Sequence, residues 1–197
     1  MGKITVFENV SLDGVMQAPG RRDEDPRGGF QHGGWAIPYA DAVLGSVAGE
    51  GMASSGALLL GRRTYEDFYA VWPNRTDNPF TEVLNNSQKY VASTTLKEPL
   101  PWINSTLLKG DVPEAVAGLR AQPGKDIVVL GSGKLVQTLM KHALIDLYVL
   151  RIHPLVLGSG TRLFADGSAF AALRLVDVKP ATTGVVVATY QPVEPAR

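Results

Sequence analysis

Short apolar runs that alternate with helical patterns constrain the fold of this chain more than any other feature. The run 126–130 passes through Gly131, Ser132 and Gly133 into the stretch 134–143, whose apolar residues recur at helical spacing. Strands that alternate with helices in this way favour a parallel sheet covered by helices. The chain is therefore expected to belong to the α/β class.

The same alternation extends over most of the chain and changes only near its end. Residues 173–178 and 184–190 have strand patterns with a short connection, which predicts an antiparallel pair added to an otherwise parallel sheet. The other expected strands cover 4–10, 57–60, 89–92, 126–130 and 144–152, and the expected helices cover 41–53, 64–71, 112–122 and 134–143.

Composition limits the partners of such a chain. Its 197 residues, 45% hydrophobic and 19% charged, predict one globular domain over 1–197. Nineteen basic residues balance nineteen acidic ones, and without a basic stripe we expect no nucleic-acid partner. No charged segment followed by an apolar run opens the chain, and no apolar stretch could span a bilayer. We therefore expect a cytoplasmic protein without a membrane partner.

Missing residue types and spacings exclude several chemistries. Without cysteine there is no disulfide, thiolate metal site, cysteine nucleophile or Cys-x-x-Cys zinc deaminase motif. The three histidines show neither H-E-x-x-H nor H-x-H spacing, so we expect no metal.

A glycine turn at the end of the expected strand 126–130 is the first candidate for phosphate binding. Gly131, Ser132 and Gly133 let the backbone approach an anion, while the first N–H groups of the next helix point at it. The segment lacks the third glycine of G-x-G-x-x-G and the spacing of a P-loop. An ordinary strand-to-helix turn is therefore the alternative.

Two further polar clusters follow other expected strands. An arginine can bind phosphate bidentately, and a threonine can cap the next helix, although a normal helix start explains the same residues. Open α/β sheets bind ligands at the carboxyl ends of their strands, so the three clusters together predict a dinucleotide. The residues of the two further clusters are Gly61, Arg62, Arg63 and Thr64, and Ser93 and Thr94.

In type and order, these motifs resemble the dihydrofolate reductase-like superfamily, most closely the reductase domain of the bifunctional riboflavin-biosynthesis deaminase/reductase and its single-domain relatives. The resemblance covers nearly the whole chain and rests on the order of the segments 11–14, 61–66, 129–133, 154–164 and 184–190. It implies a three-layer fold, with a mixed, mostly parallel central sheet between helices on both faces and the antiparallel pair at its end. It also implies NADPH as the cofactor.

The resemblance assigns roles by position. A preference for NADPH over NADH would follow if Arg62 or Arg63 pairs with the 2′-phosphate. The implied contacts are Gly61, Arg62, Arg63 and Thr64 with phosphates, Ser93 and Thr94 near the adenosine ribose phosphate, and Gly131, Ser132, Gly133 and Lys134 around the pyrophosphate.

On the substrate side, Trp35 and Asp41 resemble the tryptophan and the helix-borne acid by which folate reductases hold a pterin ring. Their spacing departs from that pattern by one added residue, and Asp41 also suits a plain helix N-terminus. His32 lies in the glycine- and proline-rich loop 17–38, where it could close over the substrate or be simply exposed.

Asp13 is the second candidate for catalysis. In the riboflavin-type reductases the corresponding segment borders the nicotinamide and the substrate, so Asp13 could position or protonate the substrate. The alternative is a turn residue before Gly14, because Asp-Gly pairs mark turns.

The expected function is an NADPH-dependent reductase that transfers a hydride to a C=N or C=O carbon of a small heterocycle, pterin-like or ribosylaminopyrimidine-like. Reduction of 5-amino-6-(5-phosphoribosylamino)uracil is the example that the family implies. A true dihydrofolate reductase, or a non-catalytic nucleotide-binding or dimeric protein that kept the fold, are the alternatives. A homodimer is expected from the family relatives.

Overall fold

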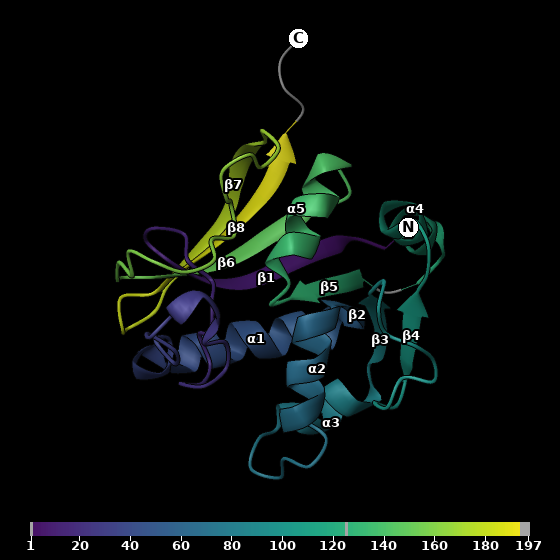
Figure 1. Ribbon diagram of the computed structural model, residues 1–197. Coiled ribbons are helices and arrows are strands. Elements are labelled where there is room, and N and C mark those ends of the chain that lie inside the picture. Colours follow the sequence, from purple (N-terminus) through teal and green to yellow (C-terminus); the bar gives the residue numbers. More distant parts are fainter. Residues whose placement is uncertain (1, 125, 194–197) are drawn as a thin grey trace.

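The eight strands of the described chain join in one mixed sheet. The computed structural model describes residues 2–124 and 126–193, and of residues 53 and 54 only the backbone (Figure 1). In the order β4-β3-β2-β5-β1-β6-β8-β7, β8 runs antiparallel to both of its neighbours and all other pairs are parallel. The strands are β1 (Ile4–Ser11), β2 (Ser55–Gly61), β3 (Gln88–Ala92), β4 (Ser105–Leu108), β5 (Asp126–Leu130), β6 (Leu147–His153), β7 (Ala172–Pro180) and β8 (Val186–Val193).

Helices cover both faces of this sheet. They are α1 (Ala42–Ser54), α2 (Arg62–Val71), α3 (Phe80–Asn86), α4 (Val112–Ala121) and α5 (Gly133–Lys141). α4 and α5 lie on one face, and α1, α2 and α3 lie on the other (Figure 1). Among the helices of the described segments, none combines the length and the apolar character that crossing a bilayer requires.

The sequence of β2 shows why both faces need cover. Side chains alternate between the faces of a strand. Leu59 packs into the cluster that contains Val116 of α4 and Leu139 of α5, whereas Leu58 packs into the cluster that contains Tyr65 of α2. A strand that is apolar on both faces is typical of a parallel sheet between two helical layers.

The predicted fold class is confirmed, and each predicted strand and helix is present; β5 has the predicted ends, and the ends of the others differ by a few residues. α2 begins at Arg62, with Gly61 at the N-cap, rather than at Thr64. β6 begins at Leu147 rather than at residue 144. The sequence pattern does not predict α3, of seven residues, or β4, of four, because neither is long enough to show a clear period.

The loop 17–38 contains two short 3₁₀ turns and otherwise irregular backbone. It is held by its own small core, in which Val15, Ala18, Phe30 and Trp35 are buried. The indole Nε1 of Trp35 donates a hydrogen bond of 2.7 Å to the carbonyl of Gln17. The loop is therefore packed against itself and the rest of the fold.

Candidate functional site

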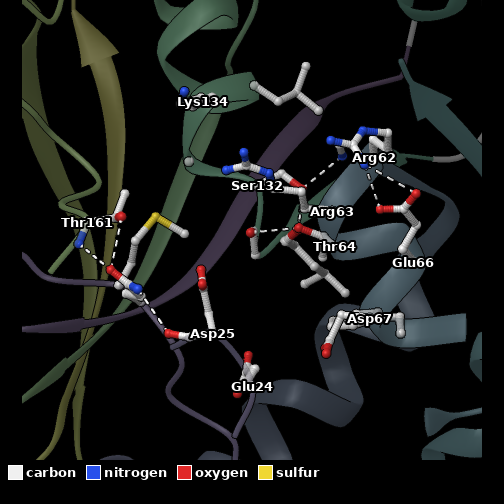
Figure 2. A pocket seen from close by; sticks show the side chains of 18 of the residues that line it. Glu24, Asp25, Arg62, Arg63, Thr64, Glu66, Asp67, Ser132, Lys134 and Thr161 are labelled. Carbon is white, nitrogen blue, oxygen red and sulfur yellow. Dashed lines mark hydrogen bonds and ion pairs between the residues drawn. The ribbon is translucent and has the colours of Figure 1, made fainter. Parts of the chain in front are cut away.

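A cavity of about 990 Å³ opens at the carboxyl ends of β2, β3 and β5. Ligands bind at this edge in open α/β sheets, and the volume lies at the upper end of small-molecule sites. Figure 2 shows some of the lining side chains. All ten residues predicted to contact the cofactor line the cavity: Gly61, Arg62, Arg63, Thr64, Ser93, Thr94, Gly131, Ser132, Gly133 and Lys134. The structure thus brings the three predicted clusters together, and the role of each residue stays a prediction.

Two helices begin at the wall of this cavity. Gly61 is the N-cap of α2 and Ser132 is the N-cap of α5, and neither makes a side-chain capping hydrogen bond. The first N–H groups of both helices are therefore free of a side-chain cap at the positive end of the helix dipole. This arrangement favours the binding of phosphate groups.

The Ser132 hydroxyl joins the two helix starts. The backbone N–H of Gly61 donates to Ser132 Oγ at 2.9 Å, and Ser132 Oγ donates to Thr64 Oγ1 at 3.0 Å. Thr64 Oγ1 in turn donates to the carbonyl of Gly131 at 2.8 Å. The sequence suggested that Thr64 caps α2. Gly61 is the N-cap instead, and the Thr64 hydroxyl holds the turn before α5 in place.

Close packing explains the glycines of that turn. Gly131 has a φ of +58°, and a Cβ there would lie 3.0 Å from Thr64 Cγ2. A Cβ on Gly133 would lie 2.5 Å from Met16 Sδ. Glycine avoids both conflicts and leaves the backbone open to a ligand. The backbone cradle, the uncapped helix starts and the cations beside them fit the diphosphate of a dinucleotide.

The charges around the cavity are divided between two sides. Figure 2 shows Arg62, Arg63 and Lys134 toward the starts of α2 and α5, and the carboxyl groups of Glu24, Asp25 and Asp67 on the opposite side. Two of these carboxylates are paired with arginines of the loop, Asp67 with Arg21 and Asp25 with Arg27. The cationic side suits phosphates, and the opposite side offers carboxyl oxygens as hydrogen-bond acceptors.

Glu8 lines the cavity as well, although the sequence analysis did not single it out. Its side chain is only 4% exposed, and its Oε1 accepts a hydrogen bond of 3.2 Å from the backbone N–H of Ser132. Burial raises the pKa of Glu8 to about 8, against the lowering effect of that N–H and of Arg151. A sequence signal existed, because Glu8 falls on the same face of β1 as the buried Ile4, Val6 and Val10.

Arg151 of β6 lies in the cavity wall near Glu8. Its guanidinium stacks over the ring of Phe7 at 4.6 Å, and its Nε is buried without a hydrogen-bond partner among the described residues. Burial lowers the pKa of Arg151 to about 10, while the neighbouring Glu8 acts in the opposite direction. Arg151 therefore remains a cation at neutral pH.

Asp13 is not among the residues that line the cavity. Its carboxylate accepts hydrogen bonds from the hydroxyl of Ser11 at 2.6 Å and from the backbone N–H groups of Leu157 at 3.1 Å and Gly158 at 2.9 Å. The Ser11 hydroxyl contributes most to lowering the pKa of Asp13 to about 2. These donors hold an ionised carboxylate in the turn after β1, and the catalytic role of Asp13 stays a prediction.

The three remaining predicted residues also lie outside the cavity lining. Asp41 is the N-cap of α1, where it accepts from the backbone N–H of Val43 at 2.6 Å and is held by Thr182. Trp35 is buried in the small core of the loop, and His32 is exposed, with its ring against Phe30. Trp35 and Asp41, whose spacing departs from that of the folate reductases, thus serve packing and helix capping in this structure.

The fold and the cavity define an α/β protein with a large cavity beside two helix N-termini at the carboxyl edge of its sheet. The model of the family described as RibD C-terminal domain matches residues 2–187, and the chain belongs to this family. Among curated proteins, the uncharacterised protein YyaP of Bacillus subtilis strain 168 is 33% identical over 141 residues, which is 68% of this chain and 72% of YyaP.

Solved structures share the fold at lower identity. A pyrimidine reductase-like protein of Corynebacterium diphtheriae matches with a TM-score of 0.68 and 13% identity, over 98% of this chain and 92% of that one. Dihydrofolate reductase of Enterococcus faecalis, in complex with NADP(H), matches with a TM-score of 0.61 and 15% identity, over 98% of each chain. The fold is therefore that of the dihydrofolate reductase-like proteins, as the sequence predicted.

Proposed function

We propose that this protein is an NADPH-dependent reductase that transfers a hydride to a C=N or C=O carbon of a small heterocyclic substrate. The observation that carries the proposal is the cavity at the two uncapped helix starts, with Arg62, Arg63 and Lys134 beside them. Membership of the RibD C-terminal domain family supports it, as does a fold shared with a reductase that holds NADP(H).

The division of charge suggests how the cavity is shared. The cationic side, with the glycine turn before α5, binds the phosphates of the dinucleotide. The opposite side, with the carboxyl group of Glu24, takes the N–H groups of an amino-substituted heterocycle, for which carboxylates are suitable acceptors. A pterin-like or ribosylaminopyrimidine-like substrate has such groups.

The bound cofactor supplies the hydride, and the chain supplies orientation and a partly closed cavity. Gln17 ties the loop to the segment that contains Thr161. Its Nε2 donates to the carbonyls of Asp25 at 2.9 Å and Arg27 at 3.0 Å, and its Oε1 accepts from the backbone N–H of Thr161 at 2.9 Å. These contacts hold the loop beside the substrate space, where it limits the access of water.

Arg63 is the residue with which to test cofactor recognition. Among the described residues its side chain has no hydrogen bond or ion pair, whereas Arg62 Nη1 lies 3.0 Å from Glu66 Oε2. A free guanidinium at the cavity suits the 2′-phosphate that distinguishes NADPH from NADH. Arg63→Ala should weaken NADPH binding by about tenfold or more and leave NADH binding unchanged, because a charged hydrogen bond contributes roughly 1.5–3 kcal/mol.

The measurement is a titration with each cofactor, followed by quenching of the three tryptophans. Arg75→Ala is the matched control, because Arg75 pairs with Asp77 and does not line the cavity. If the wild type binds neither cofactor, the proposed function is wrong. If Arg63→Ala weakened the binding of NADPH and NADH equally, the proposed contact of Arg63 with the 2′-phosphate would be wrong, but the cofactor site would stand.

Turnover separates the remaining alternatives. Oxidation of NADPH with 5-amino-6-(5-phosphoribosylamino)uracil or with dihydrofolate, each assayed at saturating cofactor, would identify the class of acceptor. Reduction of dihydrofolate alone would favour a true dihydrofolate reductase. Tight NADPH binding without oxidation by any acceptor of a broad panel would favour the non-catalytic alternative.

A homodimer through β7 is a further part of the proposal. β7 is an edge strand of the sheet, and its Leu175, Val176 and Val178 are each about half exposed. An edge strand with apolar side chains is suited to pairing with a second copy. Sedimentation of the wild type and of Val176→Lys tests this. A monomeric wild type contradicts it.

A further inference from the structure

Glu8 is the most deeply buried of the five carboxyl groups that line the cavity, since it is 4% exposed and the other four are partly or fully exposed. Three of the others have a guanidinium partner, and Glu24, like Glu8, accepts from backbone N–H groups and has a pKa raised by burial. These four are Asp25 with Arg27, Glu66 with Arg62, Asp67 with Arg21, and Glu24 with the N–H groups of Gly20 and Arg21. Among the described residues, no cation lies within ion-pair distance of Glu8.

The surroundings of Glu8 favour a neutral acid at neutral pH. The charged groups that act on it are Arg151 of β6, which stabilises the carboxylate, and Glu24 of the loop, which opposes it. Burial outweighs these effects and the N–H groups of Gly131 and Ser132, so the pKa is raised to about 8. A carboxyl group with such a pKa can both give and regain a proton near pH 7.

The position of Glu8 connects it to the reaction. Its Oε1 accepts from the backbone N–H of Ser132, in the turn that is predicted to cradle the cofactor. The same side chain lines the cavity, and Glu24, whose carboxyl group is proposed to take the N–H groups of the substrate, is close enough to act on its charge. Glu8 thus contacts the turn proposed for the cofactor and lies near the carboxyl group proposed for the substrate.

We propose that Glu8 is the catalytic acid that protonates the heteroatom of the substrate during reduction. The inference rests on the proposed function, in which the C=N or C=O carbon receives a hydride. The O–H bond of the Glu8 carboxyl breaks, and an N–H or O–H bond forms on the substrate heteroatom. Hydride and proton together add one H₂ across the double bond, the reduced nicotinamide is oxidised, and the Glu8 carboxylate regains a proton from water in the open cavity.

Glu8→Gln is the main test variant. The amide oxygen can still accept from the N–H of Ser132, and the side chain keeps its size, so the fold and cofactor binding should be retained. The amide cannot donate an acidic proton. At pH 7, turnover should fall about 100-fold or more, the usual contribution of a general acid, while the Kd for NADPH stays within about threefold.

A readout without turnover is the titration of the Glu8 carboxyl by ¹³C NMR in glutamate-labelled protein, with and without NADPH. The resonance is assigned by its loss in Glu8→Gln. A midpoint near 8 in both states supports the inference, and a midpoint below about 6 in the NADPH complex overturns it. In an active wild type, the pH profile of kcat should lose its high-pH limb in Glu8→Gln.

The possible failures can be told apart. A wild type that binds no NADPH refutes the proposed function, whatever the protonation state of Glu8. A wild type that reduces an acceptor, with Glu8→Gln within about threefold of it, refutes the role of Glu8 and leaves the proposed function intact. If neither acceptor is reduced, the NMR titration in the NADPH complex decides whether a neutral acid is present at the site.

Discussion

Glu8 and Asp13 lie five residues apart at the end of β1, and the fold gives them opposite environments. Glu8 is buried against the start of α5 and its pKa is raised to about 8. Asp13 accepts three hydrogen bonds in the turn after β1, and its pKa is lowered to about 2. Two similar side chains thus become a neutral acid at the cavity and an ionised anchor outside it, because burial outweighs the hydrogen bonds to Glu8, whereas the hydrogen bonds to Asp13 outweigh its burial.

The contrast also shows that a residue in a recognisable sequence motif need not lie in the site, and that a residue outside any motif can. Asp13 belongs to a recognisable turn motif, and its donors show that the motif joins the end of β1 to the segment 155–162. Glu8 belongs to no motif and still faces the cavity. A turn residue with many backbone partners is better explained by structure than by catalysis.

The largest expected effect on stability comes from replacing Glu8 with a residue that cannot ionise. The unfolded chain releases this proton above pH 4.5, whereas the folded chain keeps it to about pH 8, so the folded state loses stability as pH rises through that window. Glu8→Gln removes this loss. Its free energy of unfolding should match the wild type at pH 4 and exceed it at pH 9 by on the order of 3–5 kcal/mol.

Urea unfolding of both proteins at pH 4 and pH 9 measures this difference. If the free energies of unfolding of the wild type and Glu8→Gln differed by the same amount at pH 4 and pH 9, the contrast between Glu8 and Asp13 would be wrong. Such a result would mean that Glu8 titrates at the same pH in the folded and unfolded states.

Asp13→Asn should show the opposite sign. The folded pKa lies below the unfolded value of 3.8, so the stabilisation by Asp13 is present above pH 4 and is lost as pH falls toward 2. At pH 7 the variant should lose roughly 1.5–3 kcal/mol, the usual contribution of hydrogen bonds to a charged group. Urea unfolding at pH 7 and pH 3 measures the change.

Asp23→Asn is the control for this variant, because the Asp23 side chain is 91% exposed and should contribute little. NADPH binding should be unchanged in Asp13→Asn, since Asp13 does not line the cavity. Strongly reduced turnover with normal stability would return Asp13 to a catalytic role.

The smallest effect is expected at Asp41, which like Asp13 is an ionised carboxylate outside the cavity lining. Asparagine is also a good N-cap, so Asp41→Asn keeps the cap of α1 and removes only the charge. Hydrogen bonds from Thr182 and the N–H of Val43 lower the pKa of Asp41, and the melting temperature should therefore fall slightly at pH 7. Calorimetry and an NADPH titration check both points, and a changed Kd for NADPH would place Asp41 closer to the site than the structure does.

Most of the fold could be predicted from local patterns. The apolar runs of β2 and β5, and the periodic faces of α4 and α5, are recorded in consecutive residues, so their existence follows from the sequence. The ends of some elements do not follow from the sequence: Gly61 rather than Thr64 is the N-cap of α2, and the Thr64 hydroxyl donates to Gly131 instead. The short α3 and β4 depend on packing rather than on a period of their own.

Local sequence patterns predict the α/β class, the glycine turns at the strand ends and the cations that follow them, since each depends on neighbouring residues. Which carboxyl groups reach the cavity depends instead on contacts between segments that are distant along the chain. The partner of Glu8, Ser132, is 124 residues away, and the partners of Asp13 in the segment 155–162 are about as distant along the chain. Desolvation and hydrogen bonding act through space, so the protonation state of an acid follows from packing that no local pattern records.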